Sequence, residues 1–220
     1  MAQSYFNLTL DTTAPAGLSI LLNDGAIYTA SASVALKITI SDSVTTGYQM
    51  KIWGISGKTT EASAAWETYT PEKTVALSDG DGLKTVFVKV RDDVGNETAA
   101  ASASITLDTA VPIITITGPD IDTISKVSGF DTAAASFTVD TDFVEYRVCA
   151  VPATNSLVAA GTVIPTTAGS VNTSGTGQFP ADTPISVTIK GADLETASSG
   201  DGVKIIKVFA KDAAGNWSVA

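Results

Sequence analysis

Short stretches in which apolar and polar residues alternate recur along the whole chain. They cover residues 34–40, 48–52 and 86–90 in the first half, and residues 144–148 and 206–210 in the second. A period of two places every second side chain on the same face of a β-strand. Gly, Asn, Asp and Pro lie between the stretches and favour turns. The pattern predicts an all-β protein of short strands, each with one face in a core.

Two copies of one unit follow each other along the chain. Residues 10–15 return as 107–112, residues 81–84 as 201–204, and residues 91–96 as 211–216. The second copy carries extra residues in its middle. We therefore expect an N-terminal arm at 1–12, a first domain at 13–107, and a second domain at 108–220 with a long insertion at about 152–184.

The first copy carries a series of motifs that resembles a known family. It opens on Thr13-Ala14-Pro15, continues through residues 23–29 and Trp66-Glu67-Thr68-Tyr69, and closes on residues 77–92. This series resembles the bacterial immunoglobulin-like repeats found in large surface proteins and in bacteriophage virion proteins. The resemblance implies two tandem immunoglobulin-like antiparallel β-sandwiches that serve as spacers, adhesive modules or decorations, with no chemistry. The second copy lacks the Trp-x-x-Tyr segment, so no role carries over to its insertion.

Charge and composition exclude several classes of function. The net charge is −10, whereas binding to nucleic acid or to an anionic membrane surface requires clustered Lys and Arg. The chain has no His and a single Cys, Cys149. These counts exclude His-based catalysis, an internal disulfide and a Cys-based zinc cluster. We expect a protein that is not an enzyme, needs no cofactor, and binds neither nucleic acid nor membrane.

Acidic residues near the turns raise the question of a metal site. The candidate oxygen ligands for Ca²⁺ are Asp79, Asp81, Asp92 and Asp93, together with Asp11 and Asp108 near the domain joints. The spacing of an EF-hand loop and its final Glu are absent. Asp also stabilises turns by accepting hydrogen bonds from the backbone. We therefore expect turn stabilisation and no metal.

Several aromatic residues are candidates for binding. Trp53, Trp66 and Tyr69 lie where they would stack on a saccharide ring, and the alternative is that Trp66 and Tyr69 pack over the edge of the sandwich. Phe87 and Phe209 fall on the strand face opposite the inward Val and Ile. Exposed aromatics on a sheet face are typical of an interface, and the alternative is that the opposite sheet covers them.

The insertion of the second copy is a further candidate contact. The segment between Pro152 and Pro184 is polar, rich in Gly and poor in charge, and it includes Phe179. A long loop inside a compact domain is usually functional or disordered. We expect an ordered loop or an extra hairpin that touches a partner.

The two ends of the chain differ in a way that predicts assembly. Residues 4–10 repeat the pattern of residues 101–107, the last strand of the first unit, while the second unit stops at residues 217–220, where its own last strand would begin. Open sheet edges accept strands from other chains. The hypothesis is that an arm carrying Tyr5, Phe6, Leu8 and Leu10 adds to another subunit. Two alternatives are that the arm pairs within the first domain and that the natural chain continues beyond Ala220.

These features favour a non-enzymatic structural protein. The leading interpretation is a bacteriophage virion component that decorates a capsid or tail or forms part of a fibre, and that is assembled in the host cytoplasm. An N-terminal Met1 without an export signal fits this setting. Its partners would be copies of itself, other virion proteins or a host surface glycan. The alternatives are a bacterial cell-surface adhesin or spacer, and a carbohydrate-binding accessory module.

Overall fold

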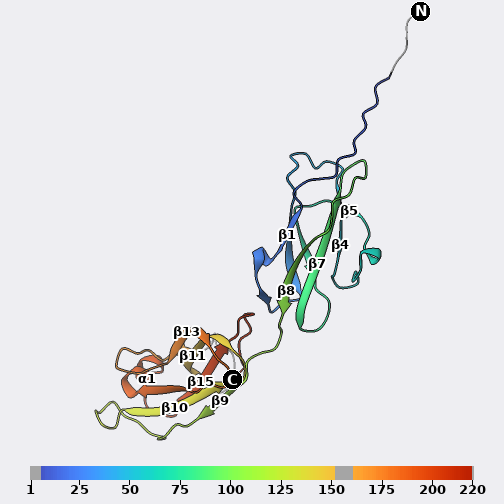
Figure 1. Ribbon diagram of the computed structural model, residues 1–220. Helices are drawn as coiled ribbons and strands as arrows, with labels where there is room; N and C mark the ends of the chain where they lie inside the picture. The colour runs from blue at the N-terminus through green and yellow to red at the C-terminus, as the bar shows by residue number, and fades with distance from the viewer. Residues whose placement is uncertain (1–5, 152–160, 220) are drawn as a thin grey trace, which may run out of the picture. The chain divides into compact units, whose positions relative to one another are not determined.

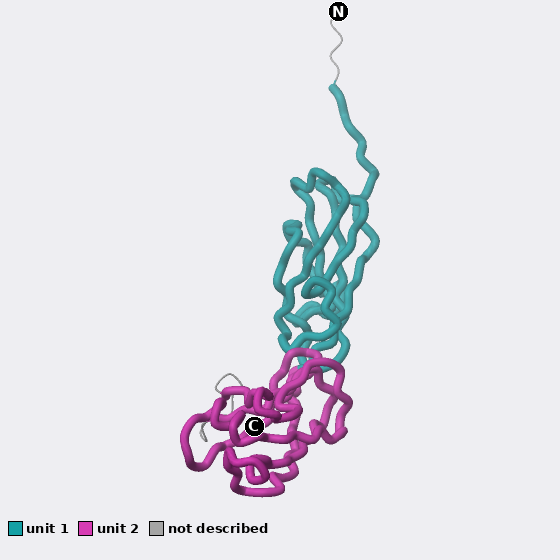
Figure 2. Tube along the Cα trace, turned by 90° about the vertical axis from the view of Figure 1, so that its left-hand side faces the viewer, with its two compact units in different colours: residues 1–108 teal, residues 109–220 magenta. Residues whose placement is uncertain are grey.

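The computed structural model describes residues 6–151 and 161–219. The chain divides between Asp108 and Thr109 into two compact units, coloured separately in Figure 2. Nearly all regular structure is β-strand, which confirms the predicted all-β class. Tyr5 and residues 152–160 of the insertion lie outside the described residues.

One layer of unit 1 is a three-stranded antiparallel sheet with the order β1–β3–β6. Its strands are β1 (Ser19–Leu22), β3 (Ser33–Thr39) and β6 (Glu72–Ala76). Exposed and buried residues alternate without a break along β3, so Val34, Leu36 and Ile38 enter the core. The 3-10 helix η1 (Asn23–Gly25) follows β1. The alternation seen in the sequence thus decides which face of this layer is buried.

The second layer of unit 1 is a five-stranded sheet with the order β2–β8–β7–β4–β5. Its strands are β2 (Tyr28–Thr29), β4 (Gln49–Trp53), β5 (Glu67–Thr68), β7 (Gly82–Arg91) and β8 (Ala101–Leu107), and the 3-10 helix η2 (Glu61–Ser63) precedes β5. β7 is central and pairs with β4 on one side and β8 on the other, both antiparallel. The short β2 pairs with β8 in parallel and ends the sheet.

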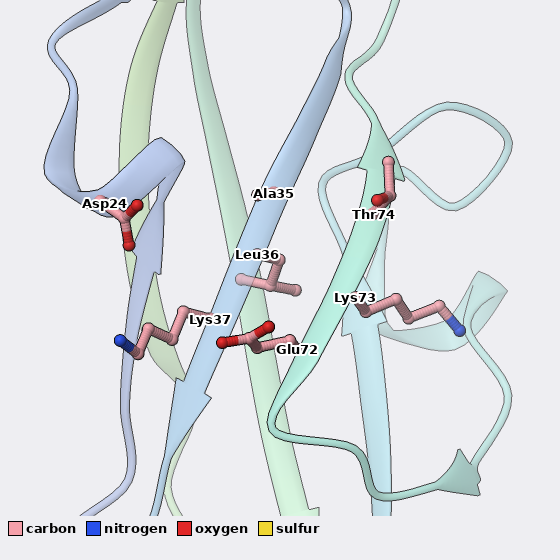
Figure 3. Close-up of a pocket in the computed structure, with 7 residues that line it drawn as sticks. All are labelled: Asp24, Ala35, Leu36, Lys37, Glu72, Lys73 and Thr74. Atoms are coloured by element: carbon pink, nitrogen blue, oxygen red, sulfur yellow. The ribbon is translucent and has the colours of Figure 1, made fainter.

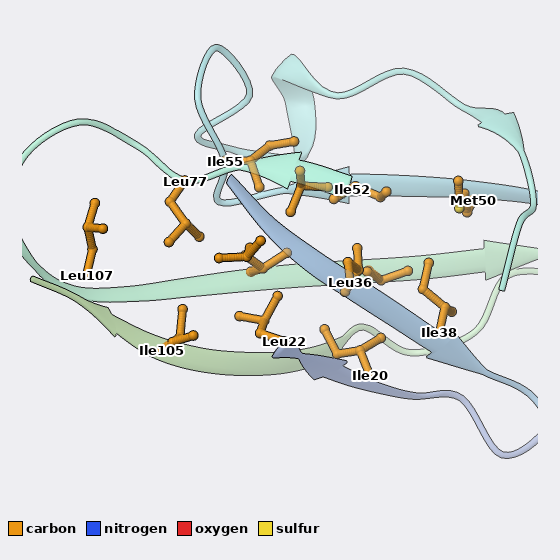
Figure 4. Close-up of a cluster of buried hydrophobic side chains, with 14 of the residues drawn as sticks. Ile20, Leu22, Leu36, Ile38, Met50, Ile52, Ile55, Leu77, Ile105 and Leu107 are labelled. Atoms are coloured by element: carbon orange, nitrogen blue, oxygen red, sulfur yellow. The ribbon is translucent and has the colours of Figure 1, made fainter. Parts of the chain in front are cut away.

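The core of unit 1 lies between these two layers (Figure 4). Val86, Val88 and Val90 of β7 are 0% exposed, and Ile105 and Leu107 of β8 are also buried. Side chains from the opposite sheet, such as Leu36 of β3, complete the cluster. β-Branched residues dominate because they pack well on a pleated surface. The last strand of the unit, β8, therefore contributes directly to the core.

Unit 2 has the same two-layer plan. One sheet has the order β14–β10–β9, from β14 (Ile185–Lys190), β10 (Thr132–Val139) and β9 (Ile114–Thr117). In the other sheet β11 (Phe143–Val151) pairs with β12 (Thr162–Val163), β13 (Ser174–Phe179) and β15 (Ile205–Lys211). The helix α1 (Gly191–Ala197) follows β14. These two layers enclose a second core that includes Phe137, Phe143 and Val208.

The described part of the insertion joins the second sheet of unit 2 and is not a free loop. β12 and β13 both pair with β11, and β13 places Thr176 opposite Glu145. The turn between them is held by Asp193 of α1, whose carboxylate accepts hydrogen bonds from Thr167, Ala168 and Ser170 at 2.8–2.9 Å. Asp193 is 0% exposed. The insertion is therefore built into the fold from residue 161 onward.

Candidate interaction site

The outer edge of β15 is the main difference between the two units. In unit 1 the corresponding strand β7 has a neighbour on both sides. Among the strands that the structure describes, β15 pairs with β11 alone. The edge that β8 occupies in unit 1 is thus without a strand among the described residues of unit 2.

The hydrogen bonds near the C-terminal end of β15 show which backbone N–H and C=O groups point toward this edge. Val90 N–H donates to Thr98 Oγ1 at 3.1 Å, and Thr98 N–H donates to the Val90 carbonyl at 2.9 Å. In unit 2, Ala210 and Ser218 form the same pair of bonds, at 3.0 and 2.8 Å. Backbone groups alternate in direction along a strand. Within β15 the N–H and C=O groups of residues 206 and 208 therefore face the outer edge. Lys204 precedes β15 and is the counterpart of Lys84, which pairs with Ile105 of β8 in unit 1.

A groove of about 530 Å³ lies beside this edge. One wall is residues 201–204 and Ile206, and the other is the segment that follows β9, residues 119 and 121–124. Asp120 Oδ1 accepts from Ala134 N–H at 2.7 Å, as Asn23 Oδ1 accepts from Ala35 N–H at 2.8 Å. The segment after β9 thus takes the position of η1 in unit 1, so the groove corresponds to the place where β8 lies.

The side chains of the groove are mainly apolar. They include Ile121, Ile124, Ile189, Leu194 and Ile206. Ile206 is only half-buried, whereas its counterpart Val86 in unit 1 is 0% exposed. An apolar groove next to unpaired backbone groups is what an added β-strand needs, because it offers both a hydrogen-bond ladder and burial.

The N-terminal segment is an exposed apolar stretch. Phe6, Leu8 and Leu10 are 87%, 87% and 86% exposed. Residues 6–18 belong to no strand, so the described part of the arm does not pair within unit 1. In Figure 1 the N-terminal end of the chain runs out from the body of unit 1. Asn96 Nδ2 donates to the Asp11 carbonyl at 3.3 Å, which places the base of the arm beside the turn after β7.

Two of the predicted contact residues, Phe209 and Phe179, lie against other side chains of unit 2. Phe209 is 0% exposed, so the prediction of an outward, accessible side chain is wrong. It forms a small cluster with Cys149 and Val151, over which Val163 and Trp217 pack. Phe179 is half-buried and stacks on Phe143 with ring centroids 4.9 Å apart. The reason is that both faces of this sheet are covered in unit 2, which strand alternation alone does not reveal.

The predicted saccharide-stacking residues are engaged with other side chains. Trp53 is 8% exposed and stacks on the half-buried Phe87 at 5.4 Å between centroids. Tyr69 packs against the core of unit 1, its hydroxyl donates to the Ile38 carbonyl at 3.2 Å, and burial raises its pKa. Trp66 is half-buried, with the Arg91 guanidinium 4.4 Å from its ring centroid. The structure does not bring the three residues together as one aromatic platform.

Trp217 forms a similar cation–π contact in unit 2, which the sequence did not reveal. Arg147 Cζ and Lys211 Nζ lie 5.0 and 5.2 Å from its ring centroid. In unit 1, Lys51 and Arg91 lie over Trp66, which comes from a different segment of the chain. Each unit thus covers this sheet face with a Trp beneath two cations, a contact that favours packing on the sheet.

The candidate metal ligands include residues that stabilise turns. Asp92 Oδ1 accepts from the N–H groups of Val94 and Asn96 at 3.0 and 2.8 Å, and Asp212 is bonded in the same way to Gly215 and Asn216. Burial raises the pKa of Asp92, but these bonds and that from the Asn96 side chain hold it below its usual value. Within residues 6–151 and 161–219, no group of three or more Cys, Asp or Glu could hold a metal ion.

Cys149 is a buried thiol. It is 0% exposed, and burial raises its pKa against the lowering effect of Arg147. A raised pKa reduces the thiolate fraction, and the thiolate is the reactive form. We therefore assign Cys149 a packing role.

A second depression lies on the outer face of the β3–β6 pair in unit 1 (Figure 3). It measures about 300 Å³ and is bordered by Lys37, Glu72, Lys73 and Asp24. Lys73 forms an ion pair with Glu67 at 2.6 Å. Positive and negative side chains both border the depression. Their electrostatic potentials oppose each other, so the depression does not favour an ion of either sign.

Comparisons with known proteins yield distant structural likenesses. Neither a protein-family model nor a curated protein matches the chain. The chain is similar to fibronectin(III)-like modules of Clostridium thermocellum CbhA at 10% identity and a TM-score of 0.49, covering 91% of this chain and 89% of that one. It is similar to a carbohydrate-binding module of the β-sandwich superfamily at 12% identity and a TM-score of 0.36, covering 95% and 100%. The D00-D0 domain of intimin matches at 14% identity and a TM-score of 0.30, covering 88% and 91%.

No helix in the described part of the chain has both the length and the apolar character that a membrane crossing requires.

Proposed function

We propose that this protein is a non-enzymatic structural protein that joins other chains through its sheet edges. The observation that carries this proposal is the edge of β15, which lacks a partner strand among the described residues and lies beside an apolar groove. The same repeat in unit 1 closes this position with β8. An edge that is open among the described residues and lies beside an apolar groove is suited to joining chains.

The charged groups support a structural role over a catalytic one. Catalytic acids and bases are usually groups in a cleft whose pKa is tuned to their task. Here the carboxylates with lowered pKa hold the chain in place: Asp92 holds a turn and Asp193 holds the loop of residues 167–170. Glu145 has a lowered pKa because it pairs with Lys211 and Arg147 on the sheet face. Each of these groups is already engaged in a structural contact.

The setting we propose is a bacteriophage virion, with the protein decorating a capsid or tail or forming a fibre module. The support is the resemblance of residues 13–92 to immunoglobulin-like repeats of virion and bacterial surface proteins. Assembly through sheet edges suits a particle built of repeated parts.

Immunogold labelling tests this setting. Antiserum raised against the purified chain is applied to phage particles and to cell envelopes from the bacterial culture that carries its gene. We expect gold on the particles. Labelling of envelopes alone would replace the virion proposal with a bacterial surface adhesin or spacer.

A further inference from the structure

We infer that residues 6–10 of one copy fill the groove beside β15 of a second copy, as the last strand of its unit 2. This inference deepens the proposed structural function and rests on it. It names the occupant of the groove, the register of pairing and the order in which copies are joined.

The arm has the side-chain pattern of β8, which has no counterpart among the described strands of unit 2. In β8, Ile105 and Leu107 are buried, Ala103 is half-buried, and Ser102 and Ser104 are exposed. The arm repeats this alternation, with apolar residues at 6, 8 and 10 and polar residues at 7 and 9. In unit 1 the apolar face of β8 packs into the core. The apolar face of the arm would enter the groove in the same way, and three side chains now about 87% exposed would become buried.

The pairing register follows from unit 1. There, Val86 lies opposite Ala103, Lys84 opposite Ile105, and Gly82 opposite Leu107. Transferred to the repeat, Ile206 lies opposite Phe6, Lys204 opposite Leu8, and Gly202 opposite Leu10. The pairing is antiparallel and uses the outward backbone groups of Ile206 and Lys204.

The second wall of the groove offers a further ladder. In unit 1, the N–H groups of Thr106 and Asp108 donate to the carbonyls of Ile27 and Thr29 at 2.8 and 3.0 Å. The corresponding residues of unit 2, 124–126, form no strand. They would take the role of β2 when the arm is present. Among its described residues unit 2 has no counterpart of β2 and none of β8, and in unit 1 these two strands pair with each other.

The joint between copies would repeat the joint within the chain. Residues 107–112 connect β8 to unit 2, and residues 10–15 have the matching sequence after the arm. The arm and unit 2 leave unit 1 at opposite ends: Asp11 is beside Asn96, whereas Asp108 follows the far end of β8 and bonds to Thr29. Donation therefore produces head-to-tail order, in which the arm of each copy completes unit 2 of the next. Such heterologous contacts build rings or filaments.

Two variants separate the donor from the acceptor. Leu8→Asp places a charge on the face that enters the groove, and Thr9→Asp is its matched control because residue 9 faces away. Lys204→Pro removes one outward N–H outside the β11–β15 ladder, and Lys204→Ala keeps that N–H. Sedimentation velocity of each chain over a wide concentration range gives its mass.

The wild-type chain, Thr9→Asp and Lys204→Ala are expected to form species of two or more chains, whereas Leu8→Asp and Lys204→Pro alone stay single. A mixture of Leu8→Asp, which keeps its acceptor, with Lys204→Pro, which keeps its donor, should give two-chain species and none larger. A wild-type chain that stays single at all concentrations would overturn the inference. So would Leu8→Asp assembling as the wild type does, or a mixture without complexes. Immunogold labelling tests the virion proposal and does not depend on self-association. Failure of the strand-donation inference and failure of the virion proposal can therefore be told apart.

Discussion

The backbone N–H of Ala210 donates a hydrogen bond to the hydroxyl of Ser218 at 3.0 Å, and Ser218 N–H donates to the Ala210 carbonyl at 2.8 Å. Both residues are buried. This reciprocal pair marks the point at which the outer edge of β15 stops being covered by its own chain among the described residues. The edge between this pair and Gly202 is where we place the donated strand.

Removing the Ser218 hydroxyl should destabilise unit 2. Ser218→Ala leaves the buried N–H of Ala210 without its acceptor, so we expect the free energy of unfolding to fall by about 1–2 kcal/mol. The free energy of unfolding is measured in urea, with the labelling of Cys149 as the signal. This signal reports on unit 2, because the single thiol lies there. Ser104→Ala, at an exposed hydroxyl in unit 1, serves as the control. Equal unfolding curves for the two variants would contradict the assignment.

Trp217 should protect Cys149 from reagents. It packs over the cluster of Cys149, Val151 and Phe209. Trp217→Ala removes this cover, so a thiol reagent should label the native variant at least several-fold faster than the wild type. The rate is followed without denaturant, and Trp66→Ala in unit 1 is the matched control. An unchanged labelling rate would show that other residues protect the thiol.

Trp66 should act as a packing residue of unit 1. It lies beneath Arg91 and Lys51, so Trp66→Ala loses apolar burial and two cation–π contacts. We expect the free energy of unfolding of unit 1 to fall by about 2 kcal/mol. Circular dichroism during urea unfolding measures the loss. A variant with wild-type stability that no longer binds a glycan retained by the wild type would instead support a saccharide site.

Unit 2 should lose stability at low pH through Asp193. Burial raises the pKa of this carboxyl, but hydrogen bonds from Ser170, Ala168 and Thr167 hold it below the ordinary value. The folded state therefore favours the ionised form, and this stabilisation is fully present above the pKa of the unfolded chain, about 3.9. It declines as the pH falls toward the pKa of the folded state.

The check is urea unfolding at a series of pH values, with Cys149 labelling as the readout. Asp193→Asn should be less stable than the wild type at neutral pH, and the difference should shrink below about pH 4. A difference that stays constant down to the most acidic pH would show that the charge of Asp193 is not the stabilising feature.

The strands were predictable because alternating apolar and polar residues place all the apolar side chains on one face of a strand, and that face is the buried one. Val34, Leu36 and Ile38 are buried as expected. The burial of Phe209 was not predictable, because it depends on Trp217 and Val163 folding over the opposite face. That cover is long-range and leaves no periodic signal.

The candidate site was predictable in part. Comparing the two repeats predicted an N-terminal arm and an open strand position in the second repeat. The groove itself was not visible, since it depends on the segment after β9 taking the position of η1. Ile206 is half-buried, whereas its counterpart Val86, which pairs with β8, is fully buried.

The most direct measurement is an engineered disulfide at the predicted register. In unit 1, Leu83 lies opposite Thr106, so residue 203 should lie opposite residue 9 of the donating copy. Residues 203 and 9 would form a non-hydrogen-bonded pair of the antiparallel ladder. The Cα atoms of such a pair are about 4.5 Å apart, a distance that a disulfide can bridge. Val203 is 91% exposed and residue 9 is exposed, so neither substitution disturbs a core.

A chain carrying Thr9→Cys and Val203→Cys is oxidised mildly and run on a non-reducing gel, beside a chain carrying Asn7→Cys and Val203→Cys. The account predicts a ladder of covalently joined chains for the first, and much less for the second, whose cysteines are out of register. Equal cross-linking of the two chains, or none in either, would contradict strand donation at this edge.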